Sequence, residues 1–142
     1  MSIHIEIAQT DEQIVSCYPV MAELRPHIAL DDFTARIRLQ QTDGFILAYL
    51  SDEGIIFAVT GFRIGVNLAW GKYLYVDDLV TSGKTRSHGY GKALFQWLVE
   101  YAKAEHCNQL HLDSGVQRFG AHRFYLTNRM DITSYHFRLM LP

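Results

Sequence analysis

A short turn with two glycines joins a strand-like run ending at Thr81 to an amphipathic helix beginning near Gly91. Glycine adopts backbone angles that are closed to other residues, so such a turn can gather several backbone N–H groups around one point. The first turn of a helix leaves its amide donors unpaired, and the helix dipole adds partial positive charge there. This arrangement favours binding of a phosphate group. The residues predicted to bind it are Arg86, Ser87, His88, Gly89, Tyr90, Gly91 and Lys92.

The same turn is also compatible with a plain strand-to-helix connection, so its spacing must be compared with known phosphate motifs. The run Ser82-Gly83-Lys84-Thr85 matches the end of a Walker A loop, but the glycine that this motif needs at position 78 is Asp78. A dinucleotide fingerprint needs a glycine at position 94, where the chain has Leu94. Both motifs are therefore excluded, and Arg-x-x-Gly-x-Gly is the pattern that is left.

The length of 142 residues predicts one domain spanning residues 1–142. The net charge is −2 and the basic residues are interspersed with acidic ones, which argues against a nucleic-acid partner. No apolar run is long enough to span a bilayer, and the first residues lack the features of a signal peptide. We therefore expect a cytoplasmic protein without a membrane partner.

Cysteine and histidine usage bears on redox and metal chemistry. Cys17 and Cys107 are far apart in the sequence and form no CxxC pattern, so both are expected to be reduced thiols. The seven histidines show no HxxxH or HExxH spacing. We expect no metal site.

Hydrophobic periodicity predicts an alternation of strands and helices along the whole chain. The pattern favours an α/β (α+β) fold, with one mixed, mostly antiparallel sheet of about six strands and about four flanking helices. A parallel pair of strands is expected around the helix that starts near Gly91. The predicted strands are 3–7, 45–50, 55–64, 72–81, 110–113 and 132–141, and the predicted helices are 10–24, 30–41, 91–104 and 118–128.

Two motifs resemble the GNAT superfamily of acyl-CoA N-acyltransferases. The family signature Gln/Arg-x-x-Gly-x-Gly/Ala corresponds to residues 86–91, between the fourth strand and the following helix. A second family feature, an Ala-x-x-Phe-Tyr helix, is matched by residues 121–125. The resemblance is good over residues 73–130. In the N-terminal half it consists of the same order of helices and strands.

The resemblance implies how acetyl-CoA would bind. The loop amides from Ser87 to Lys92 would hold the coenzyme A pyrophosphate. The fourth and fifth strands would splay apart, so that the backbone of Leu79 and Val80 could pair with the pantetheine arm as a further strand. Both residues are equally compatible with an ordinary core strand, because the backbone would do the binding.

The resemblance also implies catalytic roles. Tyr125 resembles the family's general acid, which protonates the departing coenzyme A thiolate, although an aromatic core residue would give the same pattern. Asp78 matches a position where some relatives carry an acidic residue, and it is a candidate base for the amine proton; a chain of waters is the alternative. Because adjacent strand residues face opposite sides, at most one of Asp77 and Asp78 is expected to point into the cleft.

The function implied is acetyl-CoA-dependent transfer of an acetyl group to a primary amine on a small molecule or a peptide. The alternative is an acyl-CoA-binding sensor or interaction module that does not catalyse.

Arg118 stands where many relatives have Asn. One C-terminal strand is predicted where the family commonly has two. A second subunit of a homodimer is therefore one candidate source of a wall of the acceptor pocket. Candidate pocket residues are Arg25, His27, Phe45, Arg63, Trp70 and Tyr73.

Overall fold

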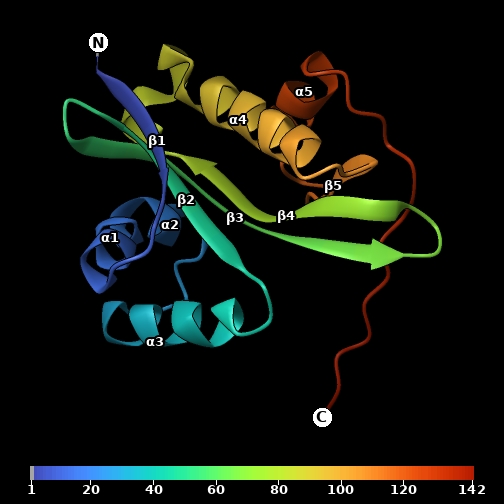
Figure 1. Ribbon diagram of the computed structural model, residues 1–142, viewed down its shortest axis with the longest axis horizontal. Coiled ribbons are helices and arrows are strands. Elements are labelled where there is room, and N and C mark those ends of the chain that lie inside the picture. The colour runs from blue at the N-terminus through green and yellow to red at the C-terminus, as the bar shows by residue number, and fades with distance from the viewer. Residues whose placement is uncertain (1) are drawn as a thin grey trace. The chain divides into compact units, whose positions relative to one another are not determined.

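The computed structural model describes residues 2–142, except the side chains of Arg86 and Ser87. The described residues fall into two compact units, one ending at His111 and the other comprising Leu112–Pro142. The first unit contains a β-sheet with helices on both faces (Figure 1). The second contains one helix and a long irregular segment.

The sheet is mixed and mostly antiparallel, as the sequence predicts. Its strands lie side by side in chain order, the first four are antiparallel, and the fifth runs parallel to the fourth. The sheet has five strands among the described residues instead of about six. The strands are β1 (Ile3–Ile7), β2 (Ile46–Asp52), β3 (Ile55–Asn67), β4 (Gly71–Thr81) and β5 (Gln109–Leu112).

Three helices, α1 (Asp11–Ser16), α2 (Tyr18–Leu24) and α3 (Leu30–Gln41), cover one face of the sheet (Figure 1). A capping box starts α1, since the Thr10 side chain accepts from the Gln13 amide and the Gln13 side chain accepts from the Thr10 amide. The single helix predicted to Leu24 is two helices. Proline in the first turn of α2 has no amide with which to continue the hydrogen bonds of α1.

The opposite face is covered by α4 (Tyr90–Ala104), whose apolar stripe follows the predicted helical period. Leu94 and Leu98 are fully buried, and Leu94 packs with Leu50 and Ala58 of the sheet. Each such leucine contributes about 1.5–3 kcal/mol by leaving water. This burial fixes the position of the helix and therefore of the turn that precedes it.

The ends of two elements differ from the sequence prediction. β3 continues to Asn67 instead of ending at residue 64, because Gly65 and Val66 still pair with β4. Asparagine favours a left-handed cap after a helix, but it is His106 and not Asn108 that takes the positive φ, of 61°. Asn108 instead joins β5 to β4: its amide donates to the Lys72 carbonyl at 2.6 Å, and its side chain accepts from the Lys72 amide at 3.0 Å.

In the second unit, α5 (Phe119–Thr127) agrees with the helix predicted at 118–128. The strand predicted at 132–141 is wrong for this structure: residues 130–142 form neither helix nor strand, and every residue from 131 onward is exposed. A strand needs a neighbour that pairs with its backbone groups, and sequence alternation alone does not supply one.

Candidate functional site

The predicted phosphate-binding turn lies at the N-terminus of α4. Residues Gly83–His88 form a 3₁₀ helix, and Gly89 follows with φ 79° and ψ 8° in the left-handed region that glycine adopts without strain. No hydrogen bond from a described side chain caps the start of α4, and the amide donors of a first helical turn have no partner within the helix. Of the predicted binding residues, the side chains of Arg86 and Ser87 lie outside the described part of the structure.

Tyr90 has a structural role that the sequence analysis missed. Its side chain is buried, its hydroxyl donates to Asp52 Oδ2 at 2.6 Å, and its ring stacks on Phe57 with centroids 5.0 Å apart. The tyrosine therefore ties the start of α4 to the end of β2. The signal in the sequence was a large aromatic residue between two glycines, where a purely ligand-binding loop needs none. The hydrogen bond from Tyr90 holds the pKa of Asp52 below its usual range.

We expect Tyr90→Phe to make the protein more sensitive to acid. Because the folded-state pKa of Asp52 is lowered, its ionised form stabilises the fold at higher pH, and this contribution is lost as the pH falls through that pKa. Removing the donor raises the folded-state pKa toward the unfolded value, so less of this stabilisation remains and the protein unfolds at a higher pH. The acid-unfolding midpoint, followed by circular dichroism, should rise for Tyr90→Phe but not for the same change at the exposed Tyr135. Equal midpoints would contradict this assignment.

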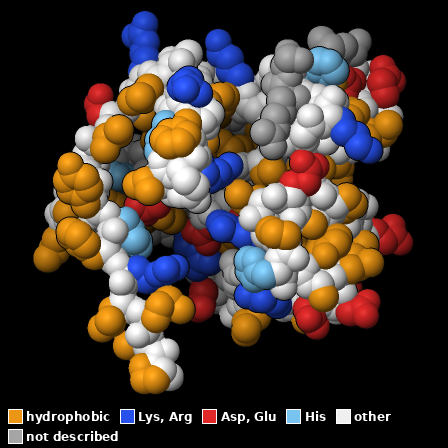
Figure 2. Space-filling view, turned by 180° about the vertical axis from the view of Figure 1, so that it is seen from behind, with side chains coloured by type: hydrophobic (Ala, Val, Ile, Leu, Met, Phe, Trp, Pro, Cys, Tyr) orange, Lys and Arg blue, Asp and Glu red, His pale blue; other side chains and the backbone are white. Residues whose placement is uncertain are grey.

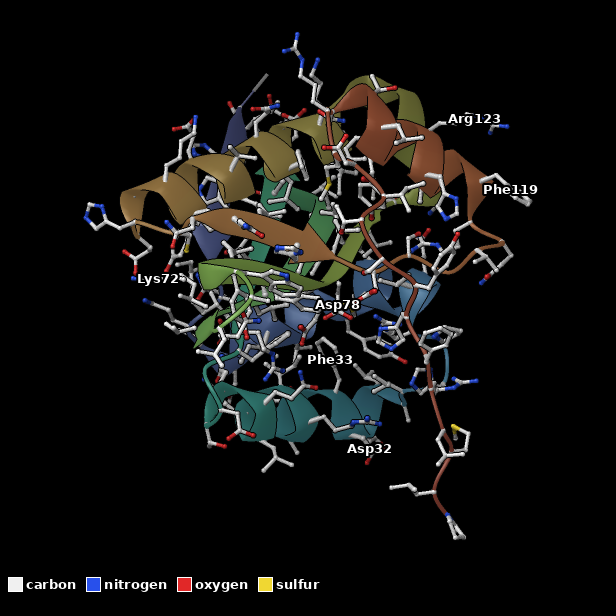
Figure 3. All side chains as sticks on the ribbon, turned by 90° about the vertical axis from the view of Figure 1, so that its right-hand side faces the viewer. Asp32, Phe33, Lys72, Asp78, Phe119 and Arg123 are labelled. Carbon is white, nitrogen blue, oxygen red and sulfur yellow. The ribbon has the colours of Figure 1, made fainter. Side chains whose placement is uncertain are left out.

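A β-bulge places both Asp77 and Asp78 on the same face of the sheet. Gly61 of β3 lies opposite Asp78, while the next residue, Phe62, lies opposite Val76, so Asp77 is an extra residue in β4. A bulge breaks the strict alternation of side chains. The strict alternation from which we expected at most one of the two carboxylates to point into the cleft therefore does not hold at this position. Figure 3 shows Asp78 on the side of the sheet that faces α3.

Two arginines bind these carboxylates. Arg25, which ends α2, donates from Nε to Asp78 Oδ1 at 2.8 Å and from Nη2 to the Asp77 carbonyl at 3.0 Å. Arg63 of β3 contacts Asp77 Oδ2 with Nε at 3.0 Å and Nη2 at 2.9 Å. The Asp78 side chain is only 12% exposed. Burial raises its pKa, and the ion pair with Arg25 opposes that rise. A carboxylate whose pKa is shifted toward neutrality is better suited to accept a proton.

The lack of a side chain at Gly61 leaves room for the Phe45 ring and for the Asp78 carboxylate. A side chain at Gly61 would collide with the Phe45 ring and lie 2.7 Å from Asp78 Oδ2. The Arg63 guanidinium also lies over the Phe45 ring, 5.4 Å from its centroid. Arg25, Phe45 and Arg63 were all candidate pocket residues, and the structure brings them together around the two carboxylates.

The other candidate pocket residues do not join this cluster. The Trp70 ring stacks on His111 with centroids 3.5 Å apart and meets the Tyr73 ring edge-on at 5.2 Å. This aromatic group lies at the beginning of β4, several residues before the bulge. His27 is exposed in the connection between α2 and α3.

The second half of β4 extends beyond β5. β5 has four residues and β4 has eleven, and the bonds between Asn108 and Lys72 align β5 with the beginning of β4. The Leu79 side chain packs toward α4, whereas the Val80 side chain packs in the cluster formed with α1, α2 and α3. An extended ligand could pair with the backbone of this part of β4 as an added strand.

Tyr125 belongs to the second unit, where it lies half-buried on α5. Burial raises its pKa, and the positive charge of Arg118 acts in the opposite direction. The hydroxyl is therefore protonated at neutral pH, as a proton donor must be. Arg118 directly precedes α5 and makes no side-chain cap with it.

The residues that the structure describes contain no group of three or more His, Cys, Asp or Glu side chains placed to hold a metal ion. None of the described helices combines the length and the apolar character that crossing a bilayer requires.

Comparison with known proteins identifies the family. Residues 7–128 match the model of the acetyltransferase (GNAT) family. The chain is 34% identical over 139 residues to an uncharacterized N-acetyltransferase, YhdJ, of Bacillus subtilis strain 168, covering 96% of this chain and 97% of that protein. The fold of this chain is similar to that of a GNAT family acetyltransferase from Staphylococcus aureus. The TM-score is 0.84 at 21% identity, and the match covers 99% of this chain and 100% of the other.

A further similar structure is AAC(6')-Iy in complex with the bisubstrate analog CoA-S-monomethyl-acetylneamine. Its TM-score is 0.83 at 11% identity, with 100% of this chain and 99% of the other covered. At this identity the likeness concerns the fold alone. The family match over most of the chain, together with the N-acetyltransferase relative, shows that the chain belongs to the acetyltransferase (GNAT) family and is an acyltransferase.

Proposed function

We propose that the protein is an acetyl-CoA-dependent N-acetyltransferase that transfers the acetyl group directly to a primary amine. The observation that carries this proposal is the N-terminus of α4 behind the left-handed Gly89, which no described side chain caps. Its unpaired amides suit the two negatively charged phosphates of coenzyme A. Because the family match runs from residue 7 to residue 128, across both compact units, we propose that residues 1–142 act as one catalytic domain.

In the proposed complex the backbone amides from Ser87 to Lys92 bind the pyrophosphate of acetyl-CoA. The pantetheine arm pairs with the backbone of Leu79 and Val80, beyond the reach of β5. These two contacts would direct the thioester to the bulge in β4. Holding acetyl donor and amine together in this way contributes to the rate without a covalent enzyme intermediate.

The amine nitrogen then attacks the thioester carbon, so that an N–C bond forms and the C–S bond breaks. An amine with a pKa near 10 is only about one part in a thousand neutral at pH 7. We propose that Asp78 takes its proton, directly or through water, and that Tyr125 donates a proton to the leaving thiolate. Arg25 is a positioning residue that holds the Asp78 carboxylate.

We expect Asp78→Asn to lower kcat/KM for the amine by about 10²-fold or less, the lower end of general-base effects. The acid limb of the pH profile should also disappear, because an amide cannot titrate. In the wild type, activity rises as the pH passes the Asp78 pKa, which burial places above its ordinary value. If the acid limb is unchanged in Asp78→Asn, a group other than Asp78 accepts the proton of the amine. Asp77→Asn is the matched control, since Asp77 is bound by Arg63.

The proposed function is tested by incubating the purified protein with acetyl-CoA and a panel of small amines, amino acids and peptides. Release of the coenzyme A thiol that depends on an amine, together with the mass of the acetylated product, would support catalysis. Tight binding of acetyl-CoA without thiol release across the panel would favour an acyl-CoA sensor instead. The identity of the productive amine would define the acceptor class.

A further inference from the structure

The arginine–aspartate cluster at the bulge in β4 presents its positive ends outward. The cluster consists of two ion pairs, Arg25 with Asp78 and Arg63 with Asp77. The Arg25 side chain is 40% exposed and that of Asp78 12%, while Arg63 is 32% exposed and Asp77 23%. The charges of the cluster sum to zero, but the carboxylates lie deeper than the guanidinium groups. A molecule that approaches the cluster from water therefore meets positive charge first.

Both guanidinium groups keep donors for a further partner. Each binds the aspartates through Nε and Nη2, and a guanidinium carries more N–H donors than these bonds use. Among the residues that the structure describes, no hydrogen bond is formed through Nη1 of Arg25 or of Arg63. Both arginines contact Asp77, one at its carbonyl and the other at its carboxylate, so the two positive ends are close together.

The surroundings of the cluster keep this positive charge local. The Phe45 ring, against which the Arg63 guanidinium packs, is buried and carries no charge of its own. Figure 3 shows Asp32 on the side of α3 that points away from Asp78, where it is exposed. Basic and acidic side chains are interspersed over the face seen in Figure 2. Attraction of an anion to the cluster would therefore come from the two arginines and not from a broad basic surface.

We infer that the acceptor carries a carboxylate as well as its primary amine, and that Arg25 and Arg63 bind this carboxylate beside Asp78. This inference rests on the proposed function and names its substrate class, amino acids and other amino carboxylates. The planar edge of a guanidinium suits the two oxygens of a carboxylate. The amine of such a molecule lies toward Asp78, which is proposed to take its proton. The outward guanidinium groups repel the second positive charge of a polyamine.

Paired acceptors test the substrate class. The probes are the common amino acids and straight-chain ω-amino acids, each compared with its carboxamide in the thiol-release assay with acetyl-CoA. For the best acid, kcat/KM should exceed that of its amide by about 10-fold or more. A carboxamide lowers the pKa of an α-amine, so the supply of neutral amine alone would favour the amide. Thiol release that is as fast with amides and simple amines would overturn the inference and leave the proposed function intact.

Two variants should move this preference in opposite directions. Arg63→Gln removes a guanidinium, so the acid-to-amide ratio of kcat/KM should fall about 10-fold. Asp77→Asn frees the Arg63 guanidinium from its ion pair, so the ratio should rise. A purely structural role of Arg63 would slow both acceptors alike, and a constant ratio would overturn the inference. Arg38→Gln is the matched control, because Arg38 is similarly exposed, at 42%, and pairs with Asp11 on the surface.

A second variant covers the case in which Arg63→Gln unfolds because Asp77 is left unpaired. Arg63→Gln/Asp77→Asn replaces the ion pair by two neutral amides, and it should lose the preference for the acid while circular dichroism shows a folded chain.

Titration calorimetry separates the inference from the proposed function. With coenzyme A present, the amino acid that binds best should bind about 10-fold more weakly to Arg63→Gln than to the wild type. Binding that depends on Arg63 without thiol release from acetyl-CoA would support the carboxylate site and overturn the proposed function. Neither binding nor thiol release with any probe would overturn both.

Discussion

Gly91→Asp should weaken acetyl-CoA binding about 100-fold, equivalent to about 2.7 kcal/mol. The substitution puts a carboxylate into the first turn of α4, where it competes for the free amides and repels the diphosphate. The same carboxylate stabilises a helix N-terminus by about 0.3–1 kcal/mol. Binding and folding should therefore move in opposite directions, which calorimetric titration and thermal unfolding would measure separately.

Gly91→Asn is the matched control for this prediction. It has nearly the same shape as the aspartate but no charge, so its loss of affinity should be much smaller. If the two variants lose affinity equally, the cause is steric. If neither loses affinity, the diphosphate does not bind at the start of α4, and the proposed orientation of acetyl-CoA would be lost with it.

Tyr125→Phe should lower kcat about 10²-fold while the dissociation constant for acetyl-CoA stays nearly the same. The change removes only the hydroxyl that is proposed to protonate the thiolate. An ordinary tyrosine has a pKa near 10 and a thiol about 8.5, so the transfer is uphill by roughly 2 kcal/mol. Burial raises the pKa of Tyr125 and makes the transfer harder still. We therefore expect an effect at the lower end of the usual 10²–10⁴ range for general acids.

Tyr101→Phe provides the comparison, because Tyr101 is another half-buried tyrosine, on α4, where its ring packs edge-on against Phe62. Its loss of a hydroxyl should leave turnover unchanged. Steady-state kinetics with saturating amine, combined with direct measurement of acetyl-CoA binding, separates kcat from affinity. Unchanged turnover in Tyr125→Phe would remove the acid assignment and leave water as the proton donor.

Features that depend on neighbouring residues could be predicted from the sequence. The capping box at Thr10, the apolar stripe of α4 and the hairpin between β2 and β3 all follow from interactions within a few residues. The glycine turn before α4 is of the same kind, because Gly89 can adopt a left-handed angle whatever the rest of the fold does. These local patterns, with the Ala-x-x-Phe-Tyr helix, were enough to indicate the family.

Features that depend on residues far apart in the sequence could not be predicted in the same way. The bulge at Asp77 arises only when β4 pairs with β3, and it is what turns two adjacent carboxylates to one face. Arg25 reaches Asp78 across 53 positions of sequence, and Tyr90 reaches Asp52 across 38. Neither contact leaves a periodic pattern in the chain.

The C-terminal segment shows the same division most clearly. Alternation from Tyr135 to Leu141 determined that these residues suit a strand, because successive side chains of a strand point to opposite sides. Whether a strand forms depends on a partner for its backbone N–H and C=O groups, and only the tertiary structure could reveal that the described chain leaves this segment exposed. Sequence sets the local preference of each segment, while pairing between distant segments decides which preferences are realised.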